Sequence, residues 1–144
     1  MLRAIKGPIT VVNDLVVVKE VQIDLNGKIT SLMFGHKYIP NKLYSQKLHI
    51  AFNQALNMFV CRQGFHSILI PDDIPITIKS LYGRRLVYAI IPKESTILIG
   101  DSNDIVSNNI IILDKIVSHH SSLETQRIQS EKFLLSKLGV GMAA

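Results

Sequence analysis

Hydrophobic residues alternate with polar residues along several short stretches of the chain, and this period predicts strands. The clearest case starts with the apolar run Leu15–Val18 and continues at Val21, Ile23 and Leu25, which indicates a strand with one buried face. β-Branched residues fit a pleated, half-buried surface well, so short runs rich in them also indicate strands. Such runs occur at residues 67–70, 74–78, 86–91 and 96–99.

Three other segments place their apolar residues on one side of an amphipathic helix. The first predicted helix covers residues 45–62 and ends before Gly64, and the second begins near Val106 and reaches Val117. The third covers residues 123–138 and follows a capping box made by Ser121 and Glu124. The stripes of the first two helices consist of Leu48, Phe52, Ala55 and Phe59, and of Val106, Ile110, Leu113 and Val117.

Turn residues separate these segments. Asn26-Gly27 is the strongest two-residue hairpin signal in the chain and predicts that residues 28–34 return beside the strand before them. Gly7-Pro8 interrupts an extended segment at residues 5–10, because proline cannot donate to a neighbouring strand. Ser107 and Asn108 are expected to satisfy backbone groups near the start of the second helix.

The order of these elements predicts an α+β fold with two small tandem domains. The first domain comprises residues 1–66 and the second residues 67–144, and they meet near Phe65–Pro71. Each domain is expected to be an antiparallel sheet packed by one helix, and a C-terminal helix follows the second sheet.

The composition agrees with a folded chain and adds a charge asymmetry. Hydrophobic residues make up 47% and charged residues 19% of the 144 residues. The net charge is +5, and all of it lies in the first 64 residues, with eight Lys or Arg against three Asp or Glu. From residue 65 onward the count is eight against eight. A basic half favours an anionic partner such as nucleic acid, although a basic surface without a function explains the charge equally well.

The residue pattern does not predict an active site, a metal site or a cofactor. Cys61 follows an apolar stripe and is expected to be a small buried hydrophobe in a reducing compartment. His119-His120 lie next to each other and therefore point in different directions, which favours a linker over a chelate. Asp72-Asp73 mark a turn after a proline. The apolar runs are too short to cross a membrane, and we expect neither a signal peptide nor a small-molecule substrate.

The stretch 96–113 resembles the C-terminal half of large-subunit ribosomal proteins of the L-six family, in their archaeal and eukaryotic form. In that family a strand ends in a glycine-containing polar turn and continues into an apolar helix. The residues that match it without a gap are Leu98, Gly100, Val106, Ser107 and Asn108. Weaker matches follow in the same order along the chain, at residues 5–8, 57–65, 74–78, 81–85 and 127–134.

This resemblance implies a structural component of the large ribosomal subunit that catalyses nothing. Family members bind ribosomal RNA near the sarcin–ricin loop and the factor-binding region, beside neighbouring ribosomal proteins. The implied location is the cytoplasmic ribosome. The RNA-binding residues would be those on the basic first half and at the turn before residue 86: Lys6, Lys37, Lys42, Lys47, Arg62, Tyr82, Gly83, Arg84 and Arg85.

An alternative from another class is a self-associating structural protein, such as a small viral matrix protein. It would share the aliphatic core and the basic surface. A matrix protein assembles by itself, whereas a ribosomal protein assembles on RNA. The state of the isolated chain and its salt-dependent binding to RNA separate the two classes.

Overall fold

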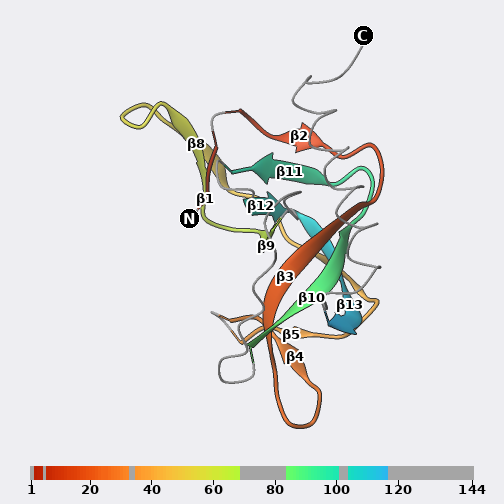
Figure 1. Cartoon of the computed structure of the whole chain (residues 1–144). Helices are drawn as coiled ribbons and strands as arrows, with labels where there is room; N and C mark the ends of the chain where they lie inside the picture. Colours follow the sequence, from red (N-terminus) through yellow and green to blue (C-terminus); the bar gives the residue numbers. More distant parts are fainter. Residues whose placement is uncertain (1, 5, 33–34, 69–83, 101–103, 117–144) are drawn as a thin grey trace, which may run out of the picture.

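The computed structural model describes residues 2–4, 6–32, 35–68, 84–100 and 104–116, which form strands and the turns between them (Figure 1). These residues contain no helix, so the prediction of an α+β fold with packing helices was wrong, and the described part of the chain is all-β. It accordingly offers no helix that is long and apolar enough to cross a membrane. The strands are β1 (Leu2–Ala4), β2 (Ile9–Thr10), β3 (Leu15–Ile23), β4 (Ile29–Thr30), β5 (Lys37–Tyr38), β6 (Leu43–Ser45), β7 (Ile50–Asn53), β8 (Met58–Cys61), β9 (Phe65–Ile68), β10 (Arg84–Ile91), β11 (Thr96–Ile99), β12 (Asp104–Ser107) and β13 (Asn109–Ile116).

Ten of these strands form one large antiparallel sheet that curls around its core. Eight follow one another in the order β2-β11-β12-β9-β3-β10-β13-β6, and β4 and β5 extend the sheet beside β3. Side chains from one face of all eight strands pack into a single hydrophobic cluster. In Figure 1, β2, β11 and β12 run across the direction of β3 and β10, as expected of a sheet curled over its own inner face.

Strand β3 is central to this sheet because it pairs with β4, β9 and β10. Its alternation places Leu15, Val17 and Val21 on the inner face and Val18 on the outer face, where Val18 meets Tyr88. The predicted strand is therefore confirmed as far as Ile23, whereas Leu25 lies beyond it and is exposed. Since β10 pairs with β3 along its whole length, residues from both sides of position 66 belong to one sheet.

The predicted helix over 106–117 is replaced by two strands as far as residue 116, so this prediction was wrong. Only Asn108 separates β12 from β13, and the chain bends at this residue. The Asn108 side chain is not a helix cap; its Oδ1 accepts a hydrogen bond from the Thr96 amide at 2.9 Å. The physical reason lies in the β-branched residues Ile105, Val106 and Ile110–Ile112, whose stiff side chains pack well in a sheet and disfavour a helix.

The predicted helix over 45–62 is also wrong, because this segment forms a hairpin of β7 and β8. The turn between them is closed by a hydrogen bond from the Asn57 amide to the Gln54 carbonyl at 3.2 Å. Asn53 Oδ1 accepts a second one from the Leu56 amide at 3.1 Å, and Asn57 adopts a positive φ of 54°. Asparagine tolerates that conformation, so the two asparagines favour a turn over a continuous helix.

A second sheet, of order β1-β8-β7, packs on the outer face of the large one. Leu2, Ala4 and Cys61 from this sheet form a buried cluster with Leu98 and Val106 of β11 and β12. Cys61 is fully buried, which confirms its predicted burial, although it ends strand β8 and not a helix. The chain passes from this sheet to the large one at Gly7-Pro8, so the predicted interruption of the extended segment is confirmed.

Two further local predictions are confirmed. The turn at Asn26-Gly27 joins β3 to β4, with Gly27 at a positive φ of 79°. Of the described residues in the predicted partner segment 28–34, only Ile29–Thr30 pair with β3 as a strand. Asp24 Oδ1 accepts hydrogen bonds from the amides of Asn26 and Lys28, both at 2.9 Å, and this holds the turn closed. The strands predicted at 86–91 and 96–99 correspond to β10 and β11.

Some predicted features lie outside the described residues. These are the C-terminal helix over 123–138 with its capping box, the strand at 74–78, the Asp72-Asp73 turn and the His119-His120 pair. For the same reason the end of the second predicted helix, Val117, is not compared with the structure.

Gly64, which links the small sheet to β9, is expected to be sensitive to any side chain. It has a φ of +143°, and an added Cβ would overlap Leu48 Cδ2 and Val106 Cγ2. We expect Gly64→Ala to lower the free energy of unfolding by about 2–4 kcal/mol, from backbone strain and overpacking together. Gly27→Ala is the matched control, because φ is also positive there but nothing lies within 4 Å of an added Cβ. Urea unfolding of both variants measures the difference. Equal losses of unfolding free energy would contradict the predicted steric overlap at Gly64.

Candidate functional site

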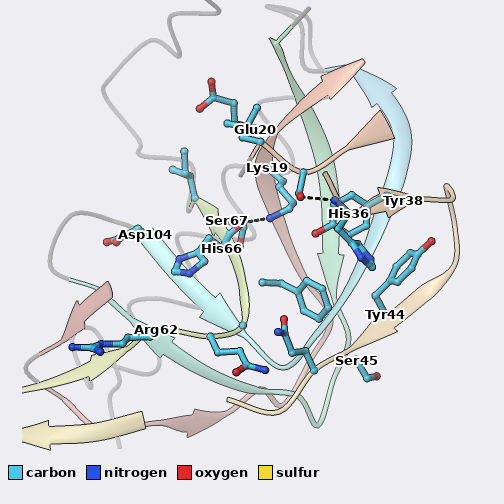
Figure 2. A pocket seen from close by; sticks show the side chains of 17 residues that line it. Lys19, Glu20, His36, Tyr38, Tyr44, Ser45, Arg62, His66, Ser67 and Asp104 are labelled. Atoms are coloured by element: carbon cyan, nitrogen blue, oxygen red, sulfur yellow. Dashed lines mark hydrogen bonds between the residues drawn. The ribbon is translucent and has the colours of Figure 1, made fainter. Parts of the chain in front are cut away.

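A cavity opens where β3 meets β9, and residues from both faces of these two strands line it. It has a volume of about 940 Å³. Residues of β3, β5, β6, β9 and the segment before β9 line it, so positions far apart in the sequence converge there. In Figure 2, His36, Tyr38 and Tyr44 lie on one side of the cavity, Arg62 and Asp104 lie on the other, and Lys19 lies between them.

Lys19 is a charged residue on the core side of β3. It occupies the inward position between Val17 and Val21, and only 7% of its surface is exposed. Its ammonium donates a hydrogen bond to the main-chain carbonyl of His66 at 2.5 Å and lies 5.8 Å from the centre of the Tyr38 ring. Burial lowers the pKa of Lys19 to about 8, so the amine stays protonated at pH 7.

An aromatic cluster of His36, Tyr38 and Tyr44 borders the cavity. The three rings contact one another edge to face, with centroids 4.8 to 5.3 Å apart. The Tyr44 hydroxyl accepts a hydrogen bond from the Ile39 amide at 2.7 Å, which fixes the ring. Burial and the neighbouring Tyr44 raise the pKa of Tyr38 to about 12, so its hydroxyl remains protonated at neutral pH.

Cations lie against this aromatic cluster from two directions. Lys19 approaches Tyr38 from the inside of the sheet, and the Lys42 ammonium lies 5.4 Å from the centre of the Tyr44 ring at the surface. Lys37 is exposed next to Tyr38 on β5. The rings are thus flanked by positive charge, which favours an anionic ligand with flat groups.

Two buried polar atoms that line the cavity have no hydrogen-bond partner among the described residues: Ser67 Oγ and Asp104 Oδ1. They lie on different faces of the sheet. Ser67 follows the inward-facing Phe65 by two residues, whereas Asp104 pairs with the outward-facing Ile68. The Asp104 carboxylate lies against Gly100, where an added Cβ would overlap it.

His66 shares the outer face with Asp104. Partial burial of the imidazole and the nearby Lys19 ammonium lower the pKa of His66 below its usual value, while Asp104 acts in the opposite direction. The imidazole is therefore neutral at pH 7. The buried positive charge at this cavity comes from Lys19.

The RNA-binding residues predicted from sequence are only partly brought together. Arg62 lines the cavity, and Lys37 and Lys42 are exposed beside the aromatic cluster. Lys47 is exposed after β6, next to the lining residue Gln46. Lys6 is exposed in the connection from β1 to β2 and does not line the cavity.

Arg84 and Arg85 start strand β10, where they pair with Gln22 and Val21. Both residues therefore belong to a strand and not to the turn that the sequence predicted for them. Tyr82 and Gly83 lie outside the described residues.

Sequence reasoning missed Lys19, His36, Tyr38, Tyr44, His66 and Ser67 as site residues. One signal for Lys19 was present, since a lysine stands at an inward position of the alternating run from Leu15 to Ile23. A lysine buried in a core is rare without a partner or a function. For the other residues no local signal exists, because the tertiary structure alone brings them together.

Comparisons with known protein families, with curated proteins and with solved structures gave no match for this chain. Its function is therefore inferred from the geometry of the cavity. Among the described residues, no three His, Cys, Asp or Glu side chains gather as the ligands of a metal ion would.

Proposed function

We propose that this protein binds single-stranded RNA through the aromatic cluster and the cations around it, as a structural component and not as an enzyme. The observation that carries the proposal is the array of His36, Tyr38 and Tyr44 with Lys19 and Lys42 against the rings. Proteins that bind single strands combine aromatic surfaces, on which bases stack, with cations that contact the phosphates. The basic first half of the chain supports the same partner.

Replacing Tyr44 with leucine should weaken binding of a single-stranded RNA about tenfold or more. A base stacked on an aromatic side chain contributes about 1–3 kcal/mol, and leucine removes the ring while keeping an apolar side chain. Phe52→Leu is the matched control, because Phe52 is 48% exposed on β7 and does not line the cavity.

The measurement is fluorescence anisotropy of a labelled RNA with wild type, Tyr44→Leu and Phe52→Leu, in a series of salt concentrations. Circular dichroism at the binding temperature checks that each variant is folded. Loss of affinity in both variants alike, or in neither, would contradict the proposed role of the cluster. An affinity that does not change with salt concentration would contradict a contribution from phosphate contacts.

A narrower form of this proposal is the large ribosomal subunit as the place of binding, with ribosomal RNA and neighbouring ribosomal proteins as partners. Its support is the sequence resemblance to the L-six family at Leu98, Gly100 and residues 106–108. The strand-turn-helix unit that this resemblance implied is not formed, which weakens the support. Co-sedimentation of the chain with large subunits is the direct test. If the protein binds free RNA but does not co-sediment with large subunits, the RNA-binding proposal stands and the ribosomal location is wrong.

The rival is a self-associating structural protein, and one observation favours it. In the described residues β7 pairs with β8 on one side only, and Phe52 is exposed on that strand. An unpaired edge with an exposed aromatic side chain is a surface on which a second copy can add. Sedimentation of the isolated chain without RNA distinguishes the two: a monomer over a wide concentration range excludes self-association as the main role.

A further inference from the structure

We propose that the cavity binds the terminal phosphate of a single-stranded RNA, with the phosphate held by the Lys19 ammonium and the Ser67 hydroxyl. This inference rests on the proposed RNA-binding function and goes further by naming the chemical group that occupies the inner end of the cavity.

Lys19 and Ser67 are placed as neighbours by the sheet. The antiparallel pair of β3 and β9 has Val18 opposite Ile68. One step along each strand places Lys19 opposite Ser67, with both side chains on the inner face. The hydrogen bond from Lys19 Nζ to the His66 carbonyl holds the ammonium over β9 (Figure 2). One small anion is therefore within reach of both groups.

Both groups are buried and have unused bonding capacity. Lys19 is 7% exposed and Ser67 4% exposed, and Ser67 Oγ has no hydrogen-bond partner in the described part of the chain. An ammonium carries three donors, and the described hydrogen bond to His66 uses one of them. A buried polar group without a partner is costly, so a ligand that accepts hydrogen bonds from both groups relieves that cost.

The ligand should be an anion, because Lys19 has no counter-ion among the described carboxylates. Burial is the cause of its lowered pKa, and none of the acidic residues in the described ranges offsets it. The two carboxylates that line the cavity, Glu20 and Asp104, belong to the opposite face of their strands. Asp104 also lies across the cavity from the aromatic cluster in Figure 2. Glu20 and Asp104 thus line the same cavity from the faces of their strands opposite to Lys19 and Ser67.

A terminal phosphate fits this position better than an internal one. An internal phosphodiester has a ribose on each side, so two sugar groups would have to enter with it. A terminal phosphate enters with one nucleotide, whose base then lies toward Tyr38 and Tyr44 at the border of the cavity. It also carries a charge of about −1.5 to −2 at pH 7, which pairs more strongly with a buried ammonium than a singly charged diester does.

The test compares RNAs of one sequence that carry a 5′-phosphate, a 3′-phosphate or no terminal phosphate. We expect wild type to bind one of the phosphorylated RNAs about tenfold more tightly than the unphosphorylated RNA, since a hydrogen bond to a charged group contributes on this scale. Lys19→Met and Ser67→Ala should each reduce this preference. Ser67→Ala should leave the affinity for unphosphorylated RNA nearly unchanged, whereas Lys19→Met should also weaken it, because Lys19 is one of the cations beside the rings. Lys93→Met is the matched control, because Lys93 is exposed at the turn after β10 and does not line the cavity.

Each outcome decides a separate question. Equal affinity for the three RNAs overturns the phosphate site and leaves the RNA-binding proposal intact. A preference that persists in Lys19→Met also overturns the assignment. If wild type binds none of the RNAs, the proposed function is wrong, and so is this inference. Adenosine monophosphate is the additional probe, and if it binds as tightly as the phosphorylated RNA, the cavity is a site for free nucleotides and not for an RNA end.

Discussion

Replacing Lys19 with methionine is expected to stabilise the free protein at pH 7 by about 1–3 kcal/mol. The pKa of Lys19 falls from 10.5 to about 8 on burial, which corresponds to roughly 3 kcal/mol against burying the charged amine. Methionine fills a similar volume without the charge. The loss of the hydrogen bond to the His66 carbonyl offsets about 1 kcal/mol of the gain.

The same substitution should change the pH dependence of stability. Between pH 8 and 10.5 the unfolded chain holds the Lys19 proton more tightly than the folded one, so wild type gains stability as the pH rises. The advantage of Lys19→Met is therefore complete below pH 8 and shrinks toward pH 10.5. Tyr38, with its pKa raised to about 12, lowers stability above pH 10, but both proteins share this effect.

Urea unfolding of wild type, Lys19→Met and Lys93→Met at pH 7 and pH 10 measures both effects. We expect Lys93→Met to match wild type at each pH, because Lys93 is exposed. A Lys19→Met variant that is less stable than wild type at pH 7 would show that the ammonium is bound by a partner stronger than the His66 carbonyl. An advantage that does not change with pH would show that the pKa of Lys19 is not lowered.

Replacing Ile112 with alanine is expected to lower the free energy of unfolding by about 2–5 kcal/mol, which is typical of a large side chain removed from a core. Ile112 is fully buried on β13, opposite Ala89 and inside the main hydrophobic cluster. Leu113, its neighbour, lies on the other face and is only half-buried against the pair Val18 and Tyr88. Leu113→Ala should therefore cost less, on the order of 1–2 kcal/mol.

This pair of variants separates the strand from the helix that the sequence pattern predicted. On that helix Leu113 belongs to the apolar stripe with Val106 and Ile110, whereas Ile112 lies off it. A helix predicts the larger loss for Leu113→Ala and a strand predicts it for Ile112→Ala. Urea unfolding of both variants at pH 7 gives the comparison. A larger loss for Leu113→Ala would contradict the all-β structure in this segment.

Features that depend on neighbouring residues could be predicted from the sequence by itself. The hairpin at Asn26-Gly27, the interruption at Gly7-Pro8 and the strands β3, β10 and β11 are of this kind. Their causes act over a few residues: a glycine that accepts a positive φ, a proline without an amide hydrogen, and β-branched side chains that favour an extended chain. The burial of Cys61 was also predicted, but from the stripe of a helix that is not formed.

Only the tertiary structure decided between helix and strand at residues 45–62 and 104–116. Their apolar residues satisfy a helical spacing, but the segments are also rich in β-branched residues or contain asparagines that close a turn. The decision came from partners distant in the sequence: β12 pairs with β9, and β13 pairs with β10 and β6. Such pairings bury both strands in one core, which outweighs the small local preference for either conformation.

The cavity also depends on tertiary structure. Lys19 and the His66 carbonyl that binds it are 47 residues apart, and the aromatic cluster joins them from β5, β6 and the residue before β5. The sequence contained the charge, with a basic first half and a lysine inside an apolar alternation. It did not contain the position of that charge, because a curled sheet of ten strands brings together residues that no local pattern connects.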